Sequence, residues 1–174
     1  RDSPLDHKHH HGLMFALAAE RVNFWEETPA AGRQVHRGFS GIRISARDGL
    51  NTASFSEQLD WVAPQQGVLL RETRQLTVYP GVRAPATLVT WSTRLEPAAG
   101  KSEVTLSGSN YFGLGMRFVV SMDKVGEMQW ADSRDNQLVQ GDTRLTRSAW
   151  CAYTASVEGK PVTAALFDHP GNPR

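Results

Sequence analysis

Histidine is concentrated near the start of the chain, where residues 6–13 hold four of the six histidines. In an extended segment, residues two apart point to the same side, so His7, His9 and His11 would share one face and His10 the other. Imidazole exchanges protons near neutral pH and is also the commonest metal ligand. The stretch is therefore a candidate catalytic site. The alternatives are a solvated loop and an expression tag. A tag is disfavoured, because a lysine breaks the run and apolar sequence follows directly.

A divalent metal is one ligand that this stretch could take. His7 and His9 would supply two imidazoles, and a site needs at least a third ligand from elsewhere in the chain. The side chains that could provide it are His36, His169, Glu26 and Asp168. Because the spacing fixes no complete ligand set, the sequence assigns no cofactor and leaves a metal at His7 and His9 as an alternative.

A second polar cluster spans residues 23–27 and is followed by His36. Trp25 stands beside two carboxylates, so its ring could stack on a sugar next to an acid or base, and Glu26 is a candidate for contacting the substrate. The alternative is that the aromatic side chains here belong to the core and the glutamates to the surface.

A third cluster, residues 167–174, follows an apolar segment and is shaped by two prolines and a glycine. Polar residues placed at the end of a rigid strand often form sites. His169 would act as acid or base with Asp168 beside it, and Asn172 and Arg174 would bind substrate.

Glu72 and Arg74 share one side of a predicted strand whose other residues of that parity are apolar. An acid and a base that both face a core form either a structural ion pair or the wall of a pocket. In the second case Glu72 contacts substrate. Arg117 is a further candidate for holding a hydroxylated or anionic substrate.

Alternation of apolar and polar residues predicts strands over most of the chain, separated by turns rich in proline and glycine. The segment 13–19 fits either a short helix or a buried strand. The segment 116–122 is apolar on both parities, which predicts a strand covered on both faces. The other predicted strands are 35–45, 53–62, 68–79, 86–95, 104–106, 148–157 and 162–167.

This pattern, without a long amphipathic helix, predicts an all-β fold built as an antiparallel β-sandwich. A length of 174 residues is enough for one core, so a single domain over residues 1–174 is expected. The balance of 19 basic and 18 acidic residues gives no electrostatic support for nucleic-acid binding. Apolar runs of about eight residues are too short to span a bilayer. Cys151, the single cysteine, is expected to be a buried core residue.

The polar clusters together resemble the PmoA-like family, whose members often carry the label methane oxygenase PmoA. Members show an Asp-His-Pro-His-His-(Arg/Lys)-Gly-Leu stretch, an Asp-Phe-Trp-like segment, a Gly-x-x-x-His element and a Phe-Asp-His-Pro-x-Asn-Pro-Arg stretch. The corresponding segments here are residues 6–13, 23–26, 32–36 and 167–174. Lys8 replaces the proline, His11 a basic residue and Asn23 the aspartate. Members also extend further at both ends, so this chain looks like the central and later part of a longer domain.

The resemblance implies a bacterial β-sandwich that is often exported to the periplasm or beyond and encoded beside sugar-processing oxidoreductases. Residues 110–114 are also similar to the Tyr-Phe-Asn-Leu element of aldose epimerases, which implies a galactose-mutarotase-like supersandwich. The histidine that precedes that element in epimerases is absent here, so their activity is not carried over. A cytoplasmic location is also compatible with a single cysteine.

Three functions follow as hypotheses. The first is a carbohydrate-processing enzyme of epimerase, lyase or hydrolase type. The second is a metal-dependent oxygenase, as the family label states. The third is a non-catalytic carbohydrate-binding module. Under the first, a small-molecule or carbohydrate ligand would lie where His9 or His10 approaches His36 and His169 at one end of the sandwich.

Overall fold

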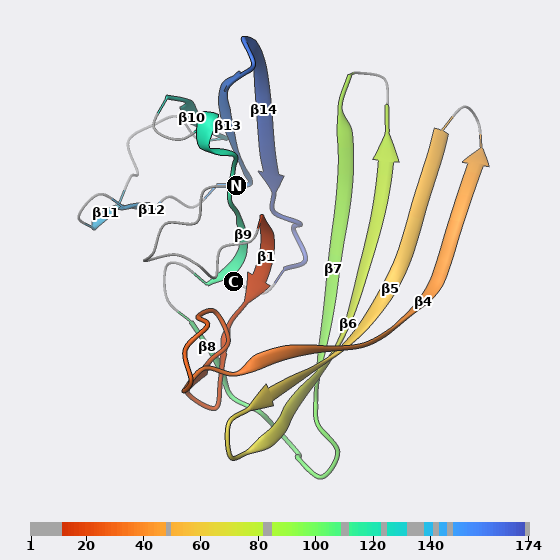
Figure 1. Cartoon of the computed structure of the whole chain (residues 1–174), viewed down its shortest axis with the longest axis vertical. Coiled ribbons are helices and arrows are strands. Elements are labelled where there is room, and N and C mark those ends of the chain that lie inside the picture. The colour runs from red at the N-terminus through yellow and green to blue at the C-terminus, as the bar shows by residue number, and fades with distance from the viewer. Residues whose placement is uncertain are drawn as a thin grey trace. The chain divides into compact units, whose positions relative to one another are not determined.

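The computed structural model describes residues 12–47, 50–81, 85–108, 112–122, 125–131, 138–140, 143–145 and 148–172. Within these ranges the chain forms fourteen β-strands and one short 3-10 turn, without an α-helix (Figure 1). The sheets are antiparallel, which confirms the predicted all-β, sandwich-like fold class. The larger supersandwich stays a prediction. The described part of the chain contains no helix long and apolar enough to cross a membrane.

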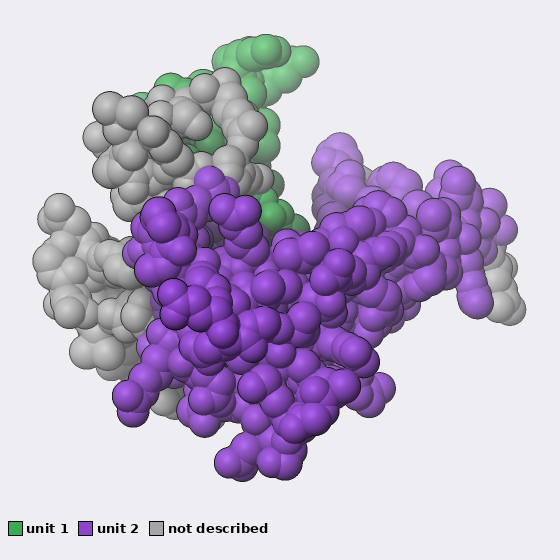
Figure 2. Space-filling view, turned by 60° about the horizontal axis from the view of Figure 1, so that its bottom comes forward, with its two compact units in different colours: residues 1–13, 116–174 green, residues 14–115 purple. Residues whose placement is uncertain are grey.

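The chain divides into two compact units, coloured separately in Figure 2. Unit 2 comprises residues 14–115, and unit 1 comprises residues 1–13 and 116–174. The expectation of one sandwich domain over residues 1–174 concerns their arrangement and stays a prediction.

Unit 2 is built on a four-stranded antiparallel sheet in the order β4-β5-β6-β7. Its strands are β4 (Arg33–Arg47), β5 (Leu50–Ala63), β6 (Gly67–Pro80) and β7 (Thr87–Pro97). These long strands match the alternating segments of the sequence, because alternation places one set of side chains on each face of a sheet. We call the face that carries Trp61 and Leu70 the core face.

Two bulges interrupt the edge strand β4. Its pairing with β5 shifts register between His36 and Gly38, and again between Ser40 and Arg43. Each shift inserts one extra residue on β4, so the side-chain alternation changes phase at each bulge. Gly41 lies in the second bulge with a φ of 60°, a conformation in which glycine carries no steric penalty. The first bulge therefore brings His36 and Phe39 to the same face.

The core of unit 2 lies at one end of the core face. Its buried side chains include Trp61, Leu69 and Leu70, which pack with Phe24 and Ala19. Phe24 and Ala19 belong to the small sheet region formed by β2 (Ala18–Ala19), β3 (Val22–Asn23) and β8 (Leu106–Ser107). The rings of Phe24 and Trp61 lie 4.9 Å apart. This packing stacks two sheets at the base of the long strands, which extend well beyond it (Figure 1).

The ambiguous segment 13–19 is extended, and is divided between β2 and β1 (Leu13–Ala16). β1 pairs with β9 (Gly113–Met116). Apolar residues at consecutive positions fit both a helix and a buried strand, and here pairing with distant segments decides the outcome.

Unit 1 contains a three-stranded sheet in the order β10-β13-β14, formed by β10 (Glu127–Trp130), β13 (Trp150–Val157) and β14 (Lys160–Phe167). Glu158 and Gly159, with φ values of 51° and 75°, make the two-residue turn between β13 and β14. Positive φ at both central residues matches the twist of a tight hairpin. A separate pair joins β11 (Leu138–Gln140) and β12 (Thr143–Leu145).

The prediction of a buried strand over residues 116–122 is wrong. β9 ends at Met116, and Val120–Met122 forms the 3-10 turn η1. Val119 and Val120 are both exposed, so the apolar residues here are not covered on two faces. Cys151 is half-buried rather than fully buried.

Candidate functional site

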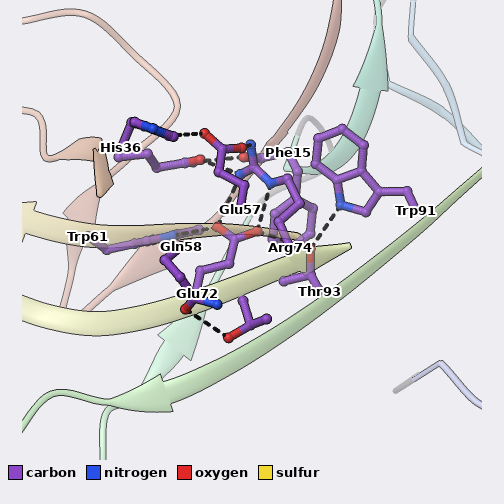
Figure 3. Close-up of polar contacts among 11 residues, drawn as sticks. Phe15, His36, Glu57, Gln58, Trp61, Glu72, Arg74, Trp91 and Thr93 are labelled. Atoms are coloured by element: carbon purple, nitrogen blue, oxygen red, sulfur yellow. Dashed lines mark hydrogen bonds and ion pairs between the residues drawn. The ribbon is translucent and has the colours of Figure 1, made fainter. Parts of the chain in front are cut away.

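A polar network lies on the core face of unit 2, beyond the apolar core. The strand register places Glu57 of β5 opposite Arg74 of β6, and Arg74 opposite Thr93 of β7. One row closer to the core, Glu72 lies between Leu59 and Leu95. Figure 3 shows these side chains converging from three strands.

Glu72 is the fully buried carboxylate of this network. Its Oε1 accepts hydrogen bonds from Arg74 Nε at 2.9 Å and Thr93 Oγ1 at 3.0 Å. Its Oε2 accepts from Trp61 Nε1 at 2.8 Å and Arg74 Nη2 at 3.0 Å. Four donors occupy the roughly four lone-pair sites of a carboxylate. Both oxygens of Glu72 are therefore bonded within the protein. In this arrangement they are not available for the substrate contact expected from the sequence.

Arg74 lies between two carboxylates. Nε and Nη2 form a fork on Glu72, and Nη2 also donates to Gln34 Oε1 at 2.8 Å. Nη1 lies 3.6 Å from Glu57 Oε2. The guanidinium stacks 4.6 Å from the ring centre of Trp91, a cation–π contact. The side chain is 12% exposed, so this cation has little freedom to bind another anion.

His36 forms the outer end of the network. Its Nδ1 lies 2.8 Å from Glu57 Oε1. An ionised carboxylate only accepts hydrogen bonds, so Nδ1 carries the proton in this pair. The tautomer of the neutral ring then leaves Nε2 as a lone-pair acceptor, and the side chain is 46% exposed. The structure thus presents an oriented imidazole with one nitrogen available for proton transfer.

Aromatic rings flank this pair on the same face. Phe39 contacts the ring of His36 at 4.5 Å between centres and meets Phe55 edge-on at 5.4 Å. On β7, the indole nitrogen of Trp91 donates to Thr93 Oγ1 at 2.8 Å, which fixes that ring beside Arg74. Beyond these rings the core face carries exposed apolar side chains such as Ile44 and Val89.

His169, in unit 1, lies in a turn that bonds to itself. Its Nδ1 accepts the backbone N–H of Gly171 at 3.0 Å, and its backbone oxygen accepts that of Asn172 at 2.9 Å. An accepting Nδ1 places the proton of the neutral ring on Nε2, the opposite tautomer to His36. The Asn172 amide donates to Asp168 Oδ1 at 2.7 Å. Asp168 is thus bonded to Asn172, and this bond closes the turn.

Trp25 and Glu26 belong to unit 2 and follow β3 directly in the chain. The Asn23 side chain accepts the backbone N–H of Trp25 at 2.7 Å and that of Glu26 at 3.2 Å, which shapes the turn after β3. The Trp25 ring lies 5.8 Å from that of Phe112, and Glu26 is exposed. The side-chain oxygen of Asn23 therefore shapes this turn, at the position where the PmoA-like motif has an aspartate.

The backbone N–H of Arg117 donates to Gly12 O at 2.9 Å, just beyond β9. Five of the sequence-predicted residues lie outside the described ranges, namely His7, His9, His10, His11 and Arg174. His36 and His169 belong to different units. The expected convergence of the three histidine clusters therefore stays a prediction. Within the described residues, no group of three or more His, Cys, Asp or Glu side chains could hold a metal ion.

The sequence did not single out Glu57, Gln34, Trp91 and Thr93 as site residues. Alternation along β5 and β7 places three of them on the same face as Leu59 and Leu95. It does not give the register that brings Glu57 to Arg74 and His36. A search for polar residues on the apolar parity of neighbouring strands would have found part of the group.

A family model matches residues 1–174, and its description reads Family of unknown function (DUF6807). The chain belongs to the DUF6807 family. No curated protein and no solved structure matches it. The model covers both units, so the network around Glu72 and the turn at His169 both lie within the family region of this DUF6807 member.

Proposed function

We propose that this DUF6807 member processes a carbohydrate and that His36 transfers a proton to or from the sugar. The observation that carries the proposal is the 2.8 Å contact between His36 Nδ1 and Glu57 Oε1 on a half-exposed imidazole. A carboxylate behind one nitrogen fixes the ring orientation and stabilises the imidazolium that forms when the other nitrogen takes a proton. Such pairs serve acid–base chemistry near neutral pH.

The surroundings of His36 support a sugar as the substrate. Sugar rings have apolar faces that pack on aromatic side chains and edges that require hydrogen-bonding groups. Phe39 and Trp91 supply rings on the same face of the sheet, and the Glu57 carboxylate lies between their strands. The carbohydrate context implied by the PmoA-like resemblance points the same way.

Few residues take part in the proposed chemistry. His36 Nε2 accepts a proton from a hydroxyl group or an acidic C–H of the sugar, and Glu57 holds the ring. A second acid–base group is needed for epimerisation, elimination or hydrolysis. The histidines expected from the sequence for this part are His9, His10 and His169.

A non-catalytic carbohydrate-binding module is the second candidate. The observation that favours it is the saturation of Glu72 and Arg74 by contacts within the protein. Glu72 and Arg74 thereby make the core face more rigid, while their polar atoms are bonded within the protein. Aromatic side chains on a stiff sheet suffice for sugar binding.

The test is a turnover and binding screen on plain and oxidised glycosides. Wild type is compared with His36→Ala and Glu57→Gln, and with Asp60→Asn as the matched control. Asp60 pairs with Arg37 at 2.8 Å and lies on the opposite face of β5 from Glu57. We expect turnover to fall roughly 10²–10⁴-fold in His36→Ala, the usual contribution of a general acid or base, and to persist in Asp60→Asn.

Full turnover in His36→Ala would remove this residue from the mechanism. Glycan binding without turnover in wild type would favour the binding module. Stoichiometric iron or copper in the purified protein, together with oxygen-dependent turnover, would favour the oxygenase that the PmoA-like label names.

A further inference from the structure

We propose that Arg74, anchored by Glu72, is a positioning residue that fixes His36 through Glu57. The importance of Arg74 for catalysis rests on the proposed function. Its effect on the orientation of His36 does not depend on that function. A series of contacts connects the fully buried carboxylate of Glu72 with the half-exposed imidazole of His36 (Figure 3).

The anchor is rigid because Glu72 is held from two neighbouring strands as well as its own. Trp61 on β5 and Thr93 on β7 donate to different carboxylate oxygens. Both Trp61 and Glu72 are fully buried. Moving this carboxylate would leave buried donors unpaired, which is unfavourable for each of them.

Arg74 connects the fixed carboxylate of Glu72 to Glu57. Its fork on Glu72 fixes the guanidinium plane, and stacking on Trp91 fixes one side of that plane. Gln34 accepts from Nη2 and in turn donates to the backbone oxygen of Phe15 at 2.7 Å, which ties the network to β1. Nη1 is thereby directed toward Glu57.

Glu57 divides its two oxygens between two partners. Oε2 faces Arg74 Nη1 at 3.6 Å, and Oε1 bonds His36 Nδ1 at 2.8 Å. The attraction of Arg74 for one oxygen sets the rotation of the carboxylate and so the position of the other. Without Arg74, the Glu57 carboxylate could turn away and His36 would lose its fixed tautomer.

The test reads the His36 tautomer directly by long-range ¹H–¹⁵N correlation at about pH 9, where imidazole side chains are neutral. The variants are Arg74→Lys, which keeps the charge and loses the fork, and Arg74→Met with Glu72→Gln, which removes both charges together. The matched control is Arg94→Lys. Arg94 pairs with Glu96 at 2.9 Å on the opposite face of the same sheet and is mostly exposed.

We expect a single Nδ1–H tautomer for His36 in wild type and in Arg94→Lys, and a mixture of tautomers in both Arg74 variants. Once a substrate is known, kcat should fall roughly tenfold to a hundredfold in the Arg74 variants with little change in KM, because positioning is lost and binding is not. A folded Arg74 variant that keeps the single Nδ1–H tautomer would overturn the proposal. If the tautomer shifts as expected and no sugar is turned over by wild type, the positioning role stands and the proposed function fails.

Discussion

Trp61 donates its indole N–H to Glu72 at 2.8 Å, and both side chains are fully buried. The bond joins the apolar core of unit 2 to its polar network, because Trp61 also packs on Phe24. One of the donors to the Glu72 carboxylate is thus a core residue, and substitution of Glu72 should affect the stability of the fold.

Glu72→Leu should destabilise the protein by roughly 3–5 kcal/mol, because it removes the carboxylate that binds the largely buried Arg74 in a fork and leaves the longer 3.6 Å contact with Glu57. The double variant Glu72→Leu with Arg74→Leu should recover most of that loss, since a buried pair replaced by apolar residues of similar volume is often neutral. Urea unfolding of both single variants and the double variant measures the coupling. Additive losses in the double variant would show that the two residues act independently.

Gly32→Ala should destabilise unit 2 by about 1–3 kcal/mol, a typical cost of overpacking. A Cβ at this position would overlap the ring of Phe24, a buried core residue. Gly38→Ala is the matched control, because a Cβ there meets no atom within 4 Å. Thermal or urea unfolding of the two variants should therefore separate them clearly, and equal midpoints would contradict the packing described for Phe24.

His36 and His169 should show opposite neutral tautomers. His36 Nδ1 faces a carboxylate and carries a proton, whereas His169 Nδ1 accepts the backbone N–H of Gly171. Long-range ¹H–¹⁵N correlation spectra distinguish the two forms, with Glu57→Gln and Gly171→Pro as assignment variants. Gly171→Pro removes the donor to His169, so only the His169 signals should change. The same tautomer at both residues would contradict one of the two bonds.

Tyr153→Phe should cost roughly 1–3 kcal/mol in unit 1. The hydroxyl group donates to Met122 O at 2.5 Å and accepts the Gly126 N–H at 2.9 Å, so its removal leaves two backbone groups without a partner. The ring itself stays stacked on Phe118 at 5.1 Å. Urea unfolding measures the loss, and an unchanged midpoint would mean that water replaces the hydroxyl group at no cost.

The sequence predicted the strands β5, β6 and β7 well because the residues of one parity along each of them are mostly apolar. Alternation placed Leu59 and Trp61 on one side of β5 and Leu70 on the mostly apolar side of β6, and all three are buried. The segment 116–122 was misassigned because apolar character alone does not specify extended structure. There, strand pairing ends at Met116 and a 3-10 turn follows.

The candidate site was predicted only in part. His36 and Glu72 were named, and a face shared by Glu72 and Arg74 followed from alternation. The partner of His36 was not found, because Glu57 reaches it through the pairing of β4 with β5. Register between strands depends on long-range pairing, which a single sequence does not encode locally.

Each of the two bulges of β4 changes the phase of the side-chain alternation, and the second cancels the change made by the first. The first moves Phe39 onto the side that holds His36, and the second restores the original phase, so that Ile44 again follows the even positions. A one-residue deletion between His36 and Phe39 would remove the first bulge and leave the two residues two apart in a regular strand, so both would stay on one face. Alignments of relatives should therefore tolerate a one-residue gap at either bulge, whereas a gap at a regularly paired position of β4 would turn the side chains that follow it to the other face.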